Sequence, residues 1–148
     1  MAKGSFDVTD LIAPLMIRIP LGLIFIAHGS QKLLGLFDGQ GLTGTFKTFE
    51  EKMGIPPIFT LLAIIAEFGG GLGIVTGFLT RLSAAGISAV MLVAIYKIHW
   101  AHGFFLNINC ITGRGHDIEY NIALLGMALY LLIAGGGRWC LDRLVFKG

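Results

Sequence analysis

The chain has 148 residues, of which 55% are hydrophobic and 14% charged, and its formal net charge is +2. A soluble domain usually carries about 25% charged residues, so too few polar side chains remain here to cover a water-facing surface. The lysines and arginines are scattered singly between apolar segments, which excludes the basic patch of a nucleic-acid-binding protein. The composition predicts a membrane protein of one domain, residues 1–148, surrounded mainly by the lipid bilayer.

Four apolar segments come close to the length of about 20 residues that a helix needs to cross a bilayer. In chain order they cover residues 11–36, 57–79, 82–100 and 118–134. The second begins at a pair of prolines, and the fourth stops at three consecutive glycines, which hold a helix poorly. The sequence therefore predicts an all-α membrane protein with four transmembrane helices in an up-down bundle.

An even number of spans places both termini on the same side of the membrane. The basic residues on that side would be Lys3, Arg81, Arg138, Arg143 and Lys147. The basic residues of the opposite side are fewer and are offset by acidic neighbours. Because lysine and arginine are enriched on the cytoplasmic side of membrane proteins, we expect the N- and C-termini to be cytoplasmic.

The second apolar segment contains a repeat of small residues. Gly69, Gly73 and Gly77 recur every four residues, so they would share one face of a regular α-helix. Small residues at this spacing let membrane helices approach closely. We predict that the three glycines form a helix–helix interface, either with the third helix or between protomers.

Ionisable residues also lie inside the apolar segments, where an isolated charge costs from about 3 to more than 10 kcal/mol. Arg18 falls about 10 Å into the first helix, at 1.5 Å per residue. Glu67 falls near the middle of the second helix. A carboxylate at that depth must be protonated or paired with a cation, and Arg18, Lys32 and Lys97 are the candidate partners.

Further polar residues gather on the side of the membrane opposite the termini. They are His28 and Lys32 from the first helix, Lys97 and His99 from the third, and Glu119 and Tyr120 from the fourth. Since Glu67 would lie just below them, we predict one polar cluster, built by all four helices and open toward the outer face. In the alternative interpretation, Lys32, His99 and Trp100 are interfacial anchors that reach the lipid headgroups.

The two histidines at similar depth, His28 and His99, would also be compatible with bis-histidine haem ligation. However, the chain has no Cys-x-x-Cys-His attachment motif, and a lone pair of histidines is an unspecific pattern. A phosphate-binding P-loop is also lacking, and the glycines after Glu67 lie inside a membrane helix. We therefore expect no haem, no metal and no tightly bound cofactor.

Several motifs in this order resemble those of the DoxX family. They are "RIPLGLIFIAHGSQKLLG", "AEFGGGLGIVTGFLTRLSA", "HGFF", "GRGHDIEYNIALL" and "GGGRWCLD", in which Asp142 matches the family's acidic residue. The resemblance implies a four-helix protein of the bacterial cytoplasmic (inner) membrane. Relatives have been associated with quinone-linked sulfur oxidation and with membrane redox complexes that counter thiol stress. The superfamily is also similar to eukaryotic cargo- and lipid-handling membrane proteins, so the fold alone does not fix the chemistry.

These observations predict a membrane subunit of a redox system, an oxidoreductase subunit linked to a quinone, to sulfur or to thiol stress. The polar cluster would bind a quinone headgroup or a small anionic sulfur compound, and Glu67 and Glu119 would relay protons. The expected binding residues are Arg18, His28, Lys32, Lys97, His99 and Tyr120. The expected partners are another oxidoreductase or a second copy of the chain. The alternatives are a small-molecule or lipid binding or transport protein without catalysis, and an assembly subunit whose charges only lock the helices.

Overall fold

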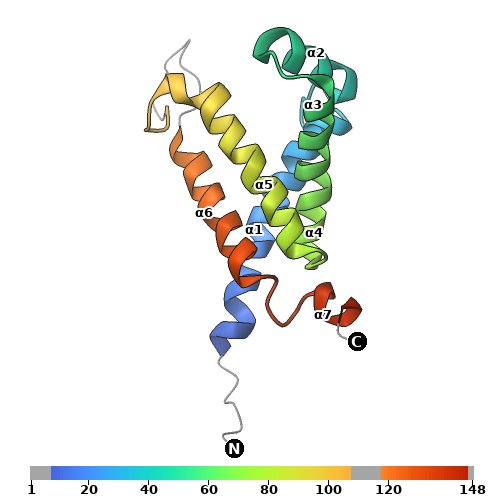
Figure 1. Cartoon of the computed structure of the whole chain (residues 1–148), viewed down its shortest axis with the longest axis vertical. Helices are drawn as coiled ribbons and strands as arrows, with labels where there is room; N and C mark the ends of the chain where they lie inside the picture. Colours follow the sequence, from blue (N-terminus) through green and yellow to red (C-terminus); the bar gives the residue numbers. More distant parts are fainter. Residues whose placement is uncertain (1–7, 108–117, 147–148) are drawn as a thin grey trace, which may run out of the picture.

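The computed structural model describes residues 8–107 and 118–146, and all regular elements in these two ranges are helical (Figure 1). The elements are α1 (Val8–Leu33), α2 (Gly41–Met53), α3 (Pro57–Ile64), the π-helical η1 (Ile65–Gly69), α4 (Gly70–Thr76), α5 (Thr80–Ala94), the π-helical η2 (Ile95–His99), the 3-10 turn η3 (Trp100–His102), α6 (Ile118–Ala134) and α7 (Leu141–Val145).

Three helices are long and apolar enough to cross a membrane. They are the apolar part of α1, Ile12–Leu33, the continuous helix formed by α3, η1 and α4, and the continuous helix formed by α5, η2 and η3. α6 is a shorter apolar helix. The predicted all-α membrane fold is thereby confirmed. The start of α1 and the short α7 lie at one end of the molecule, here named the α7 end, and α2 lies at the other, the α2 end (Figure 1).

The turn between α4 and α5 differs from the predicted boundaries. α4 ends at Thr76 rather than 79 because Gly77 adopts a left-handed conformation with φ +72°, which glycine tolerates without steric cost. α5 begins at Thr80 rather than 82. The carboxylate of Asp142 accepts hydrogen bonds from the backbone N–H groups of Leu79 (2.5 Å) and Thr80 (3.0 Å), so it caps α5 from a distant part of the chain.

Arg18 joins three segments at the α7 end. Its side chain is buried, and its guanidinium donates hydrogen bonds to four backbone carbonyls. The acceptors are Ile74 at 2.7 Å and Val75 at 2.7 Å, in the last turn of α4, and Gly136 at 2.9 Å and Trp139 at 2.6 Å, in the connection before α7. The carbonyls of a last helical turn have no partner within the helix, so Arg18 satisfies two of them while it fastens the connection to α1.

Glycines bring α1 into backbone contact with the helix that contains η1 and α4. A Cβ atom on Gly29 would lie 2.5 Å from the backbone nitrogen of Phe68, and one on Gly71 would lie 2.8 Å from that of Ile26. Real Cβ atoms do not approach other atoms this closely, so neither position has room for a larger residue. α1 and this helix therefore pack at the distance that small residues allow.

The prediction that Gly69, Gly73 and Gly77 together form one helix–helix interface is wrong. A Cβ on Gly69 would touch only a side chain of its own helix, at 3.9 Å, whereas one on Gly73 would collide with Ser83 of α5 and one on Gly77 with Cys140. The prediction assumed a regular α-helix. Gly69 instead ends a π-helical segment, which changes the register of the residues around it, and Gly77 lies beyond the end of α4.

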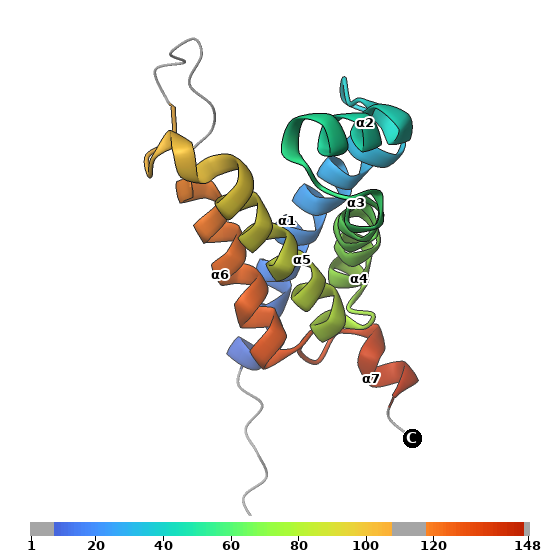
Figure 2. The same cartoon turned by 45° about the horizontal axis from the view of Figure 1, so that its top comes forward.

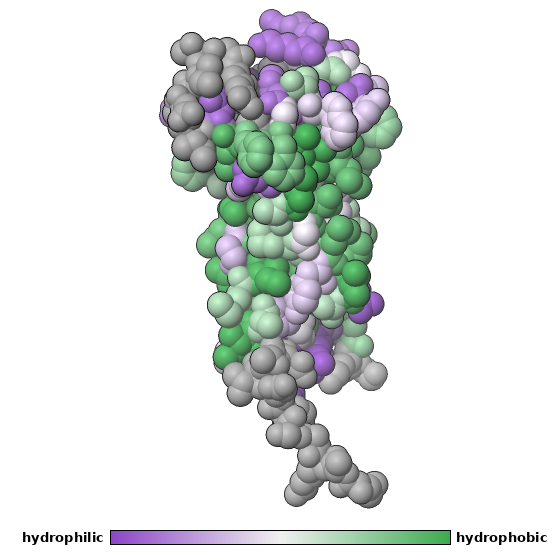
Figure 3. Space-filling view, turned by 90° about the vertical axis from the view of Figure 1, so that its left-hand side faces the viewer, coloured by the Kyte–Doolittle hydropathy of each residue, from purple (hydrophilic) through white to green (hydrophobic). Residues whose placement is uncertain are grey.

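The buried hydrophobic core lies where α1, α4, α5 and α6 cross. Its members are Leu21, Phe25, Ile74, Ala84, Ile87, Met91, Leu124, Ala128 and Leu131. Beyond this crossing, α5 and its partner α6 diverge from α3 toward the α2 end (Figures 1 and 2). On the face shown in Figure 3, hydrophobic residues cover the middle of the molecule and hydrophilic ones gather at its upper end, as expected for a chain that crosses a bilayer.

Substituting Gly29 with alanine should separate α1 from η1, because the added methyl group would meet the backbone of Phe68. We expect Gly29→Ala to lower the free energy of unfolding by about 2 kcal/mol, within the range for overpacked sites. Thermal unfolding in a mild detergent would measure the loss. Gly126→Ala is the matched control, since its Cβ would have no atom within 4 Å. Equal melting temperatures for the two variants would contradict this packing.

The Arg18 hydrogen bonds predict a second, larger effect. Arg18→Met removes the donors of four carbonyls and should lower the free energy of unfolding by about 3 kcal/mol or more, because several buried acceptors lose their partner. Arg81→Met is the control, since Arg81 donates to the carbonyl of Ile133 at an exposed position. The same melting experiment should show a loss of less than about 1 kcal/mol for that variant. A small effect of Arg18→Met would show that the stability of the bundle does not depend on these hydrogen bonds.

Candidate functional site

A cavity of about 1360 Å³ lies between the two long helices that meet at the α4–α5 turn, and it is partly open to the surroundings. It exceeds the roughly 300–1,000 Å³ of most small-molecule sites. Its wall is mostly apolar and includes Phe25, Phe49, Phe59, Leu62 and Leu124. The cavity extends from residues beside α2 to residues beside the α4–α5 turn. Its shape and lining suit a molecule with a long apolar part.

Six of the eight predicted site residues line this cavity. They are His28 and Lys32 from α1, Glu67 from η1, Lys97 and His99 from η2, and Tyr120 from α6. The side chains therefore converge from four helices, and they lie in the parts of these helices toward the α2 end. What they do there stays a prediction.

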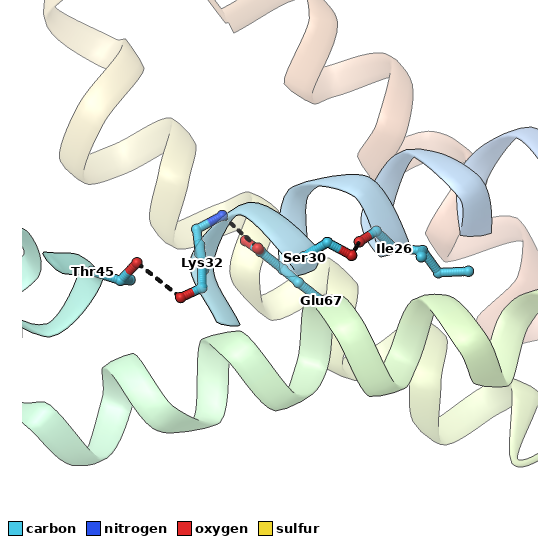
Figure 4. Close-up of polar contacts among 5 residues, drawn as sticks. All are labelled: Ile26, Ser30, Lys32, Thr45 and Glu67. Carbon is cyan, nitrogen blue, oxygen red and sulfur yellow. Dashed lines mark hydrogen bonds and ion pairs between the residues drawn. The ribbon is translucent and has the colours of Figure 1, made fainter. Parts of the chain in front are cut away.

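Lys32 and Glu67 form an ion pair in the cavity wall (Figure 4). The Nζ atom of Lys32 lies 2.5 Å from Oε2 of Glu67, and the Glu67 residue is only 4% exposed. Of the three cations predicted as partners of Glu67, the structure pairs it with Lys32. Direct contact offsets the high cost of burying each charge alone.

A hydrogen bond from α2 holds the backbone of Lys32. The hydroxyl of Thr45, in α2, donates to the backbone carbonyl of Lys32 at 3.2 Å (Figure 4). Two residues earlier on α1, the Ser30 hydroxyl donates to the Ile26 carbonyl of its own helix at 2.7 Å. α2 is thereby attached beside the ion pair, and its Phe49 also lines the cavity.

Two π-helical segments carry two of the three charged side chains that the described cavity wall contains, Glu67 and Lys97. η1 presents Glu67 on one wall, and η2 presents Lys97, Ile98 and His99 on the other. A π-helical turn accommodates an extra residue, is uncommon, and occurs often at functional sites. On η2 and just beyond it, the neighbouring Tyr96 and Trp100 are 76% and 69% exposed. Aromatic residues suit the membrane interface, so this segment separates a lipid-facing side from a cavity-facing side.

Arg18 and Glu119 are not brought to the cavity. The guanidinium of Arg18 donates four hydrogen bonds to carbonyls at the α7 end. The Glu119 carboxylate accepts a hydrogen bond from the backbone N–H of Leu106 at 3.1 Å, and the Glu119 N–H donates to the Phe104 carbonyl at 3.0 Å. Both residues hold backbone segments together, so this geometry favours structural roles for them over ligand binding or proton relay.

The sequence analysis did not single out Asn121, a buried polar residue of the cavity wall. Asn121 is 5% exposed and directly follows Tyr120 on α6. A lone amide inside an apolar helix is costly unless it faces protein or a cavity, and that signal could have identified it. Phe49 was missed as well, because nothing in the sequence indicates that α2 reaches back to the cavity.

The described residues contain no group of three or more His, Cys, Asp or Glu side chains placed to hold a metal ion. Cys140 is a buried free thiol near the α7 end and donates to the Gly137 carbonyl at 3.1 Å. Cys110 lies outside the described residues. The polar side chains with which the described cavity can meet a ligand are therefore the Lys32–Glu67 pair, His28, Lys97, His99, Tyr120 and Asn121, together with Thr76 and Ser83 beside the α4–α5 turn.

Comparison with known proteins finds one matching family model and three relatives. The family model described as DoxX matches residues 13–100. Three relatives match over most of the chain. "Inner membrane protein YqjF" of Escherichia coli is 33% identical over 145 residues, 98% of each chain. "Uncharacterized membrane protein Rv3486" of Mycobacterium tuberculosis is 32% identical over 136 residues, covering 88% of this chain and 80% of the relative. "Putative oxidoreductase CatD" of Bacillus subtilis is 27% identical over 137 residues, covering 93% and 90%. No solved structure matches.

Removing one partner of the buried ion pair should destabilise the bundle more than removing both. Lys32→Met leaves the Glu67 carboxylate buried without its cation and should cost about 3–5 kcal/mol of unfolding free energy. The double variant Lys32→Met/Glu67→Leu replaces the pair with apolar side chains and should recover most of that loss. Thermal unfolding of wild type, single variants and double variant gives the coupling. Additive losses would mean that the two side chains do not interact.

Proposed function

The chain belongs to the DoxX family of membrane proteins, and from this we propose that it is the membrane subunit of a redox system that binds a quinone in its cavity. The subunit would lie in the bacterial cytoplasmic (inner) membrane, where the name of the Escherichia coli relative places that protein. Both termini would be cytoplasmic, so the α2 end and the polar part of the cavity would face outward. The redox part of the proposal is supported by the name of the Bacillus subtilis relative.

The observation that carries the proposal is the division of the cavity into a long apolar wall and a small charged region. A membrane quinone has the same division, with a polar ring and a long apolar tail. The partly open side of the cavity would let the molecule enter from the surrounding lipid. The ring would then lie at the Lys32–Glu67 pair and the tail along Phe25, Phe59 and Leu62.

The side chains at the polar region can supply what quinone chemistry requires of a binding subunit. Reduction of a quinone to a quinol takes two electrons and two protons. A partner oxidoreductase would supply the electrons, the Lys32–Glu67 pair would pass on one proton, and water entering the open side of the cavity would supply the other. Glu67 is the one carboxyl group among the described residues of the cavity wall, so it would take up or release a proton there. The Lys32 ammonium has three donors, one of which is directed at Glu67. The others would donate to a ring oxygen.

A second candidate function is the binding or transport of a lipid or small molecule without electron transfer. The size of the cavity favours it, since 1360 Å³ has room for more than a small headgroup. The same residues would hold such a ligand. The identity of the bound molecule therefore decides between the two functions.

The test is the ligand content of the purified protein. We expect wild type, extracted gently with its native lipids, to carry about one quinone per chain, detected by native mass spectrometry and by solvent extraction. Glu67→Gln should reduce this content by about tenfold, because it removes the charge that holds Lys32 in position. Glu119→Gln is the matched control and should keep its quinone, since Glu119 lies outside the cavity wall.

Each other result has a defined meaning. A lipid in place of the quinone, lost in Glu67→Gln and kept in Glu119→Gln, would support the second function and reject the first. Equal loss in both variants would place the site elsewhere. A wild type free of any ligand would contradict both functions. Melting temperatures of the variants would separate loss of binding from loss of folding.

A further inference from the structure

The charged side chains of the cavity do not balance one another. Among the described residues, the charged side chains in its wall are Lys32, Glu67 and Lys97. Lys32 and Glu67 neutralise each other in direct contact. Lys97 makes no ion pair with the residues that the structure describes. With the histidines neutral, the cavity therefore carries one excess positive charge.

The other described acidic groups near the α2 end do not offset this charge. Glu119 is directed at the backbone N–H of Leu106 and does not line the cavity. Asp38, just before α2, and Glu50 and Glu51 on α2 are exposed and are also absent from the cavity wall. Glu67 is already engaged with Lys32. Any group that neutralises Lys97 within the cavity must therefore come from outside the described part of the chain.

The position of Lys97 differs from that of a simple membrane anchor. On the same segment, the exposed Tyr96 and Trp100 are four residues apart and so share one side of the helix. Lys97, Ile98 and His99 all line the cavity, and the Lys97 side chain is also exposed. A lysine that only reached for the headgroups would not need to line an apolar cavity.

We propose that the cavity selects amphiphiles with an acidic headgroup, and that Lys97 is the counter-ion that recognises the acid. This inference rests on the proposed function, in which the cavity holds an amphiphile from the membrane, and it adds the charge of the ligand. A charged partner for Lys97 gains from the low dielectric of the surrounding apolar wall. In the redox function, the acidic species is the quinol monoanion, which a quinone becomes on receiving two electrons from the partner oxidoreductase and one proton.

The experiment compares two probes with the same alkyl chain. Oleyl sulfate keeps its negative charge at any working pH, and oleyl alcohol is neutral. Binding to the full chain in nanodiscs of phosphatidylcholine would be measured by native mass spectrometry at several probe concentrations. We expect wild type to bind oleyl sulfate about tenfold more tightly than oleyl alcohol. Lys97→Met should abolish this preference, by lowering the affinity for oleyl sulfate far more than the affinity for oleyl alcohol.

Two further variants make the assignment specific. Lys97→Arg keeps the positive charge and should keep the preference. Lys47→Met removes an exposed lysine of α2 that does not line the cavity, so it should also keep the preference and exclude a general effect of net charge. Equal affinity of wild type for the two probes, or a preference that survives in Lys97→Met, would overturn the proposal.

A competition with decylubiquinone separates this inference from the proposed function. Displacement of oleyl sulfate by the quinone, with the charge preference intact, supports both. A preference for oleyl sulfate without displacement by decylubiquinone keeps the acidic ligand and removes the quinone. Binding of decylubiquinone in a cavity that shows no preference between the oleyl probes keeps the quinone and removes the role of Lys97.

Discussion

The buried guanidinium of Arg18 is the interaction on which the arrangement of the helices depends. A charge inside a membrane protein persists only where its donors are satisfied, and Arg18 satisfies them with carbonyls of α4 and of the connection before α7. These contacts hold α1, α4 and the C-terminal segment together at one end. Asp142, in the segment so held, then caps α5. The start of α5 is therefore fixed beside α4, and the helices are free to diverge toward the other end.

That divergence creates the cavity, and the ion pair of Lys32 and Glu67 lies in its wall. Near the α7 end, small residues and the core close the space between the helices. Toward the α2 end, α5 packs against α6 and diverges from α3 (Figures 1 and 2). Side chains of α3 and α5 line the space between these two helices but do not fill it. Lys32 and Glu67 join α1 to η1 at one wall of this space, beside the close contact of Gly29 with Phe68. The two buried charged residues therefore have different roles. Arg18 binds backbone carbonyls at the α7 end, whereas Glu67 faces the cavity.

The π-helical segments link the fold to the site. A regular helix would advance every residue by the same angle, whereas η1 and η2 each absorb an additional residue and change which side chains face inward. Glu67 and Lys97 both lie within such segments, on opposite walls of the cavity. These segments lack the regular hydrogen-bond pattern of an α-helix. In this chain they occur at two positions that bear charged side chains of the cavity.

The sequence by itself determined the membrane class, the four apolar helices and the family, because hydrophobic length and motif order are local properties of the chain. It also identified the buried charges, since a charge in an apolar segment is conspicuous wherever it points. The tertiary structure decided how those charges pair: Glu67 with Lys32, and Arg18 with backbone carbonyls instead of a ligand. It also decided that Gly69, Gly73 and Gly77 face different neighbours. The physical reason is that pairing and packing depend on how each helix is rotated about its axis. π-helical turns and distant caps such as Asp142 set that rotation. Neither feature produces a periodic pattern in the sequence.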